Sequence, residues 1–178
     1  AIGGETFHVP AALLRYPSAA NAGEGSAIET RRIELALGWP DLGALAPGRS
    51  GIHLTIAAGH DPFGEKERFE RLFAPRFAAG AVAGPEGLSG RQMMTGTGYG
   101  GEIVYYPSAT LEKNGQAQRF YYARCGVPRA DPAPLSCLRG LRLAPGLQVS
   151  YRFDAALLGE WRQMERAGLN LLARMRAD

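Results

Sequence analysis

The sequence is poor in lysine, histidine and cysteine, and it has no long apolar run. Of its 178 residues only Lys66 and Lys113 are lysines, so arginine supplies almost all of the positive charge. Three histidines and two cysteines, widely spaced, do not form a usual metal-binding pattern. No segment approaches the roughly 18 consecutive apolar residues that a transmembrane helix needs. We therefore assign no cofactor, no metal ligand and no membrane span.

The composition is that of a folded globular protein, with 46% hydrophobic and 21% charged residues. A chain of this length is close to one ordinary domain, so we expect a single globular domain over residues 1–178. The net charge is +3, and acidic residues are interspersed with the arginines, as in residues 29–34. Interspersed signs make a poor phosphate-binding surface, so nucleic acid is not an expected partner.

Alternating apolar and polar residues predict strands at residues 33–39, 52–56, 138–143 and 147–153. A short edge strand is expected at 7–9, and aromatic and β-branched residues predict further strands at 103–106 and 119–124. Asn114 and Gly115 between these last two are typical of a hairpin turn. The glycine-rich residues 78–100 give no prediction.

Two helices are expected. Asp61 and Pro62 are typical of a helix start, and Pro75 should end that helix. Asp154 is expected to cap a long C-terminal helix, whose apolar residues recur every three or four positions from 157 to 175. The order of elements predicts an α+β fold, an antiparallel sheet with hairpins that is covered on one face by the two helices.

Cys125 and Cys137 enclose eleven residues that include three prolines, and each cysteine adjoins a predicted strand. A disulfide between them would close this loop and stabilise the fold by about 3 kcal/mol in the chain-entropy model. Disulfides persist in oxidising compartments, and the abundance of alanine, glycine and arginine is typical of GC-rich bacteria, so we expect the periplasm. Two buried free cysteines in a cytosolic protein are the alternative.

The chain starts with AIGGETFHVP and has no initiator methionine. This start fits a cleaved signal peptide, or a cut just after an N-terminal membrane anchor, or the remnant of a tag. Each of the first two accounts agrees with export, so we expect a protein released into the periplasm or anchored to the inner membrane.

No catalytic residue is assigned. The stretch TGTGYGG at 95–101 lacks the lysine and the following helix of a phosphate-binding loop. His53, His60 and Glu102 would have to converge in a cleft to serve an envelope enzyme acting on peptidoglycan or lipid. That enzyme is one alternative function, and a small-ligand or lipid carrier is another.

Tyrosine and arginine gather in the two aromatic stretches. Neighbouring residues of a strand point to opposite faces, so one tyrosine of each Tyr-Tyr pair faces away from the core unless both faces are covered. Exposed tyrosine and arginine are favoured at protein interfaces. The predicted protein-binding residues are Tyr105, Tyr106, Arg119, Tyr121, Tyr122 and Arg124.

The segments FHVP, RRIELALGWPDL and YRFDAALLGEW, together with the cysteine pair, resemble small, functionally uncharacterised exported or membrane-anchored proteins of proteobacteria. The resemblance implies an envelope compartment and a shared fold, and it supplies no catalytic residue. The expected function is that of a periplasmic, non-enzymatic binding protein, in particular an inhibitor or immunity-type partner of another envelope protein.

Overall fold

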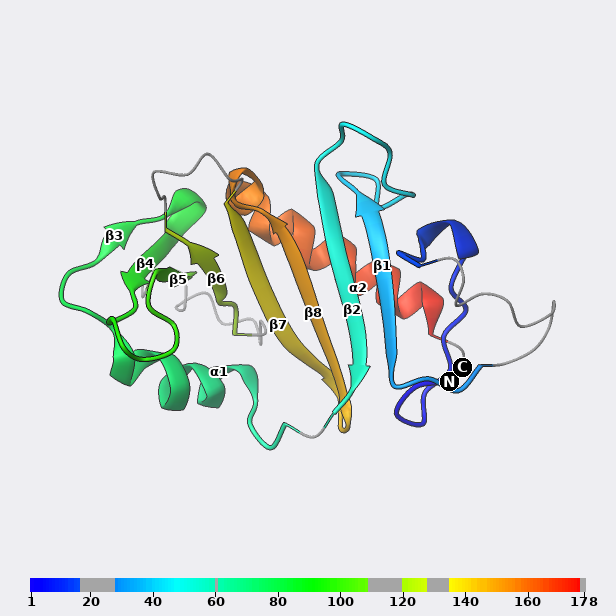
Figure 1. Ribbon diagram of the computed structural model, residues 1–178, viewed down its shortest axis with the longest axis horizontal. Coiled ribbons are helices and arrows are strands. Elements are labelled where there is room, and N and C mark those ends of the chain that lie inside the picture. The colour runs from blue at the N-terminus through cyan, green and yellow to red at the C-terminus, as the bar shows by residue number, and fades with distance from the viewer. Residues whose placement is uncertain (17–27, 60, 109–119, 128–134, 177–178) are drawn as a thin grey trace. The chain divides into compact units, whose positions relative to one another are not determined.

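The computed structural model describes residues 1–16, 28–59, 61–108, 120–127 and 135–176 (Figure 1). Within these ranges it has an eight-stranded antiparallel sheet, in the order β1-β2-β8-β7-β6-β5-β4-β3, and two helices. The longer helix is C-terminal, so the predicted α+β fold is confirmed.

The chain divides into two compact units, each built from separate segments. Unit 1 consists of Ala1–Asp61, Arg142–Phe153 and Glu160–Asp178, and unit 2 consists of Pro62–Leu141 and Asp154–Gly159. Because the chain passes between the units several times, no single linker divides them. The single domain expected from the sequence stays a prediction.

Three strands form the sheet of unit 1: β1 (Arg32–Gly38), β2 (Gly51–Ala58) and β8 (Leu147–Asp154). Leu35 pairs with Leu54, which in turn pairs with Tyr151, and all three side chains are buried. Residues directly opposite each other point to the same face, so the alternating patterns of the three strands coincide. One face is consequently apolar, and the other carries polar and small residues.

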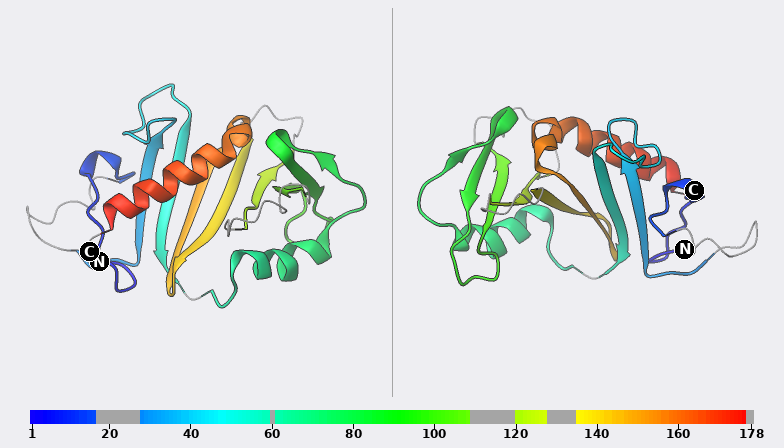
Figure 2. Two further views of the ribbon diagram at one scale, coloured as in Figure 1. Left: turned by 180° about the vertical axis from the view of Figure 1, so that it is seen from behind. Right: turned by 45° about the horizontal axis from the view of Figure 1, so that its top comes forward.

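Helix α2 (Trp161–Met175) covers the apolar face of unit 1, as the view from behind shows (Figure 2). Five large apolar residues fall on one side of the helix and are buried; they are Trp161, Met164, Leu171, Leu172 and Met175. At the end of α2, the N–H of His8 donates to the carbonyl of Met175 at 2.7 Å, and Glu5 forms an ion pair with Arg176. The edge strand expected at 7–9 is reduced to one bridge, between Phe7 and Arg176.

Unit 2 holds β3 (Val82–Ala83), β4 (Leu88–Gln92), β5 (Glu102–Pro107), β6 (Ala123–Gly126) and most of β7 (Ser136–Ala144). β3 and β4 lie in the glycine-rich stretch that gave no prediction. The hairpin of β7 and β8 is confirmed, with its turn at Pro145 and Gly146. The turn predicted at Asn114 and Gly115 lies outside the described residues.

The first helix begins later than predicted. α1 (Glu65–Arg68) starts after Gly64, which is extended at φ −70° and ψ 167°, and no side chain caps it. An extended Gly64 interrupts any helix that Pro62 could have started, so the predicted cap by Asp61 is wrong. A π-helical turn (Phe69–Phe73) and a 3-10 turn (Ala74–Arg76) continue α1. The chain leaves the helix directly after Pro75 and Arg76, as predicted.

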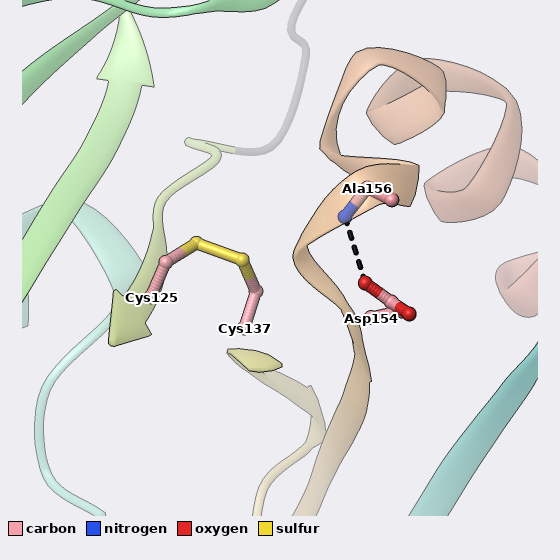
Figure 3. The surroundings of a disulfide bond; sticks show 4 residues. All are labelled: Cys125, Cys137, Asp154 and Ala156. Atoms are coloured by element: carbon pink, nitrogen blue, oxygen red, sulfur yellow. Dashed lines mark hydrogen bonds between the residues drawn. A yellow bond between two sulfur atoms is a disulfide. The ribbon is translucent and has the colours of Figure 1, made fainter. Parts of the chain in front are cut away.

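The predicted start of the C-terminal helical segment is confirmed. The carboxylate of Asp154 accepts a hydrogen bond from the N–H of Ala156 at 2.9 Å (Figure 3). A 3-10 segment (Ala155–Glu160) follows and leads into α2. Further 3-10 turns lie at Ala11–Leu13 and Pro85–Gly87. Among the described residues, no helix combines the length and the apolar character needed to cross a membrane.

Candidate functional site

Cys125 and Cys137 form a disulfide, as the sequence predicted (Figure 3). The two residues are direct partners in the pairing of β6 with β7, and their side chains are buried. The bond therefore joins two strands that already hydrogen-bond to each other. It also makes the segment between the two cysteines a covalently closed loop. No free cysteine is present in the chain.

Tyr121 and Tyr122 are both buried, with 2% and 3% of their surface exposed. One of them was expected to face away from the core unless both faces of the sheet were covered, and neither does. β6 begins only at Ala123, so the alternation of a strand does not apply to this pair. Burial raises the pKa of Tyr122, against the opposing effect of Arg68 and other nearby arginines, so its phenol stays neutral at ordinary pH.

Arg139 on β7 is fully buried, which the sequence did not indicate. Its guanidinium carbon lies 5.0 Å from the ring centroid of Tyr121 and 5.6 Å from that of Tyr122. It donates hydrogen bonds to the carbonyls of Gly140 at 2.7 Å and Phe120 at 3.2 Å. Aromatic faces and carbonyl oxygens thus replace the water that a buried guanidinium loses. Two of the predicted interface tyrosines therefore serve a structural role around Arg139.

Tyr106 belongs to an aromatic cluster that joins the helical segment 65–76 to β5. Its ring lies 4.9 Å from that of Phe69 in an edge-on arrangement and stacks on Phe77 at 6.1 Å. Edge-on and offset contacts of this kind are the favoured geometries of aromatic pairs. The side chain of Tyr106 is only half-buried, so the cluster reaches the surface.

Arg124 also belongs to this cluster. It lies over the rings of Phe73 and Tyr99, at 5.6 Å and 5.2 Å, and forms an ion pair with Glu102 at 3.2 Å. Glu102 was a candidate catalytic residue if the protein were an envelope enzyme. Its carboxylate is instead paired with an arginine. Because Arg124 already has these partners, its first role is to order the cluster.

Tyr105 packs against the backbone of Gly90 and Gly84. A Cβ atom at Gly90 would lie 2.6 Å from a methyl of Val82 and 2.7 Å from the Tyr105 ring. Glycine is required here because any side chain would collide with both neighbours. Tyr105 is half-buried, Val82 is exposed, and Arg119 lies outside the described residues. A protein-binding role for this region stays a prediction.

The polar face of unit 1 has a regular layout that follows from the strand register. In Figure 1 it is the side of β1, β2 and β8 turned toward the viewer, opposite α2. Three rows of residues cross it: Arg32-Ala57-Gln148, Glu34-Thr55-Ser150 and Ala36-His53-Arg152. Each of these side chains is half-buried or exposed. Small residues occupy much of the centre, so this part of the sheet forms an open, low-relief surface.

Arginines dominate the charge of this face. Glu34 is flanked by Arg32 at 2.7 Å and by Arg15, from the neighbouring segment, at 3.4 Å. The side chains of Arg32 and Arg15 are 62% and 43% exposed. Together with exposed Arg152 there are three arginines and one glutamate, so the face is positive.

His53 lies within this positive surface. Burial lowers its pKa, and the charges of Arg15 and Arg152 lower it further, against the weaker opposing effect of Glu34. His53 is therefore neutral at pH 7. Its Nδ1 atom is buried and has no hydrogen-bond partner within the described structure. If the protein were an envelope enzyme, His60 would have to lie near His53. His60 is outside the described residues. The described part of the chain holds no group of three potential metal ligands.

The Trp39-Pro40-Asp41 segment has a structural role. The indole N–H of Trp39 donates to Glu160 at 2.9 Å, and the peptide bond to Pro40 is cis. Arg49 donates to the carbonyl of Trp39 at 2.9 Å and to Asp41 at 3.2 Å, which lowers the pKa of Asp41. These bonds fix the connection between β1 and β2 beside the polar face.

Comparison with known proteins finds a likeness at the level of the fold. No family model and no curated protein matches the chain. A solved structure with a similar fold is that of Smlt3025, an immunity protein of the Stenotrophomonas maltophilia type IV secretion system. The TM-score is 0.63, the match covers 100% of this chain and 92% of that chain, and the sequences are 18% identical. At this identity the likeness establishes a shared fold alone.

Proposed function

We propose that this protein is an immunity-type protein of the bacterial periplasm, which protects its cell by binding and neutralising a toxic protein. The observation that carries the proposal is the likeness to the immunity protein Smlt3025, which extends over all of this chain. The partner would be a protein that a secretion system delivers, and protection would require a stoichiometric complex and no chemical reaction.

Two features of the chain support this proposal. The Cys125–Cys137 disulfide suits an oxidising compartment such as the periplasm, where the protein would be free or anchored to the inner membrane. The sheet of unit 1 leaves one face open, which gives a rigid, solvent-accessible surface of the kind that protein partners bind.

A competition assay tests the proposal. The gene is deleted from its native bacterium, and the deletion strain is grown in contact with the parent, which has an intact secretion system. We expect the parent to kill the deletion strain. A plasmid copy that is exported should restore survival, whereas a copy confined to the cytoplasm should not.

The controls separate function from compartment. Killing should disappear when the competitor lacks its secretion system. Equal survival of the deletion strain and the parent would contradict an immunity role. Rescue by the cytoplasmic copy would keep the immunity role and contradict the periplasmic location.

A further inference from the structure

We propose that the open face of β1, β2 and β8 in unit 1 is the surface that binds the partner, and that the partner presents an acidic protein surface to it. This inference rests on the proposed function and identifies the site that performs it. The face is defined by the three cross-strand rows centred on Thr55, with Arg15 at its edge.

The two faces of this sheet differ in what covers them. The apolar face is buried under α2, whereas the residues of the rows are half-buried or exposed even though they lie at the centre of three paired strands. Ala36, Thr55 and Ser150 provide a surface with few projecting side chains, across which a partner can approach closely. A paired sheet is also rigid, so binding would cost little ordering of the backbone.

Charge determines which kind of partner fits. Arg15, Arg32 and Arg152 outnumber Glu34, whose charge is already shared between two of these arginines. The face would repel a second copy of itself, because arginines would then meet arginines. An acidic protein surface would instead meet complementary charge across the whole face, and such complementarity accelerates encounter and fixes orientation. Arginine is also the charged residue most enriched at protein interfaces.

His53 gives the face a feature besides its charge. Neutral imidazole with a buried, unpartnered Nδ1 atom lies between Arg15 and Arg152. Because the Nδ1 atom is closed to solvent, a partner would meet only the remaining, half-exposed part of this uncharged ring.

The experiment uses the same competition assay, with variants of the exported protein in the deletion strain. Arg32→Glu/Arg152→Glu reverses two charges on the open face. Arg166→Glu/Arg174→Glu is the matched control, because both residues are exposed on α2, outside the open face. Thr55→Trp fills the centre of the face without changing its charge, and tryptophan is well tolerated in strands. Circular dichroism and thermal melting of the purified variants verify that each one folds.

We expect the α2 control to protect as the wild type does. Arg32→Glu/Arg152→Glu should lower survival by at least about tenfold, since opposed like charges at an interface are strongly unfavourable. Thr55→Trp should lower survival to a similar extent, because its bulky side chain holds the partner away from the sheet. Full protection by the two folded face variants would overturn this site while the proposed function stands. Failure of the wild type itself to protect would overturn both.

A last arm tests the nature of the ligand. The wild type and Arg32→Glu/Arg152→Glu are mixed with vesicles rich in phosphatidylglycerol and sedimented. We expect neither protein to sediment with the vesicles. Binding of the wild type that the double variant loses would assign the face to the membrane and overturn the acidic protein partner.

Discussion

Reducing the Cys125–Cys137 disulfide should lower the free energy of unfolding by about 3 kcal/mol. The sequence separation is 12 residues, and closing a loop of that length removes about 9.5 cal/mol/K of entropy from the unfolded chain in the chain-entropy model, or about 2.8 kcal/mol at 25 °C. The folded state should change little, because β6 and β7 remain paired through hydrogen bonds.

Urea unfolding of the oxidised and the reduced wild type measures this difference with identical side chains in both samples. Cys125→Ala/Cys137→Ala provides a second comparison, and it should lose more, between about 3 and 5 kcal/mol, because truncating two buried side chains adds a packing cost to the lost cross-link. The unfolding free energy should also depend more steeply on urea concentration in both cases, since the chain without the cross-link exposes more surface when it unfolds. A difference below about 1 kcal/mol between the oxidised and reduced wild type would refute the loop-closure argument.

Three further predictions concern Arg139, Gly90 and His53. Arg139→Met should cost about 1–3 kcal/mol in urea unfolding, because the carbonyls of Phe120 and Gly140 lose their guanidinium donor and the tyrosine rings lose their cation; unchanged or higher stability would contradict that environment. Gly90→Ala should cost about 1–3 kcal/mol through overlap with its neighbours, whereas Gly140→Ala, whose added Cβ meets nothing within 4 Å, should escape this cost. The folded-state pKa of His53 lies below its ordinary value of 6.5, so the melting temperature should fall as the pH drops below 6.5. His53→Gln should remove part of that dependence, and identical pH profiles for the wild type and the variant would count against the lowered pKa.

The sign of the His53 effect follows from proton uptake. Between the folded-state pKa and 6.5, the unfolded chain binds a proton on His53 that the folded chain excludes. Acidification in this range therefore favours unfolding. The contribution of His53 to stability is complete above the unfolded-state value and is lost as the pH falls through the folded-state value.

The sheet of unit 1 could be predicted because its local and long-range requirements agree. Residues 33–37 and 52–56 alternate with a period of two, and each strand buries one face under α2 while exposing the other. The alternation therefore determined which face is open. The polar side of β2, where the sequence placed His53, is the face that we propose to bind the partner.

The errors arose where a local signal did not determine the structure. Asp61 and Pro62 have the local chemistry of a helix start, yet the helix begins only after the extended Gly64. Tyr121 and Tyr122 have strand composition, yet they precede β6 and are both buried. Nothing in the local sequence distinguishes Arg139 from an exposed strand arginine, because its burial depends on tyrosines that are distant along the chain.

Isothermal titration calorimetry measures whether this protein neutralises its partner by forming a stoichiometric complex. The protein that kills the deletion strain is purified and titrated with the oxidised wild-type chain. We predict a saturable one-to-one complex, with binding weakened by Arg32→Glu/Arg152→Glu and unchanged by Arg166→Glu/Arg174→Glu. Absence of a complex, in a chain that still protects cells, would contradict the account and indicate that protection requires a chemical reaction.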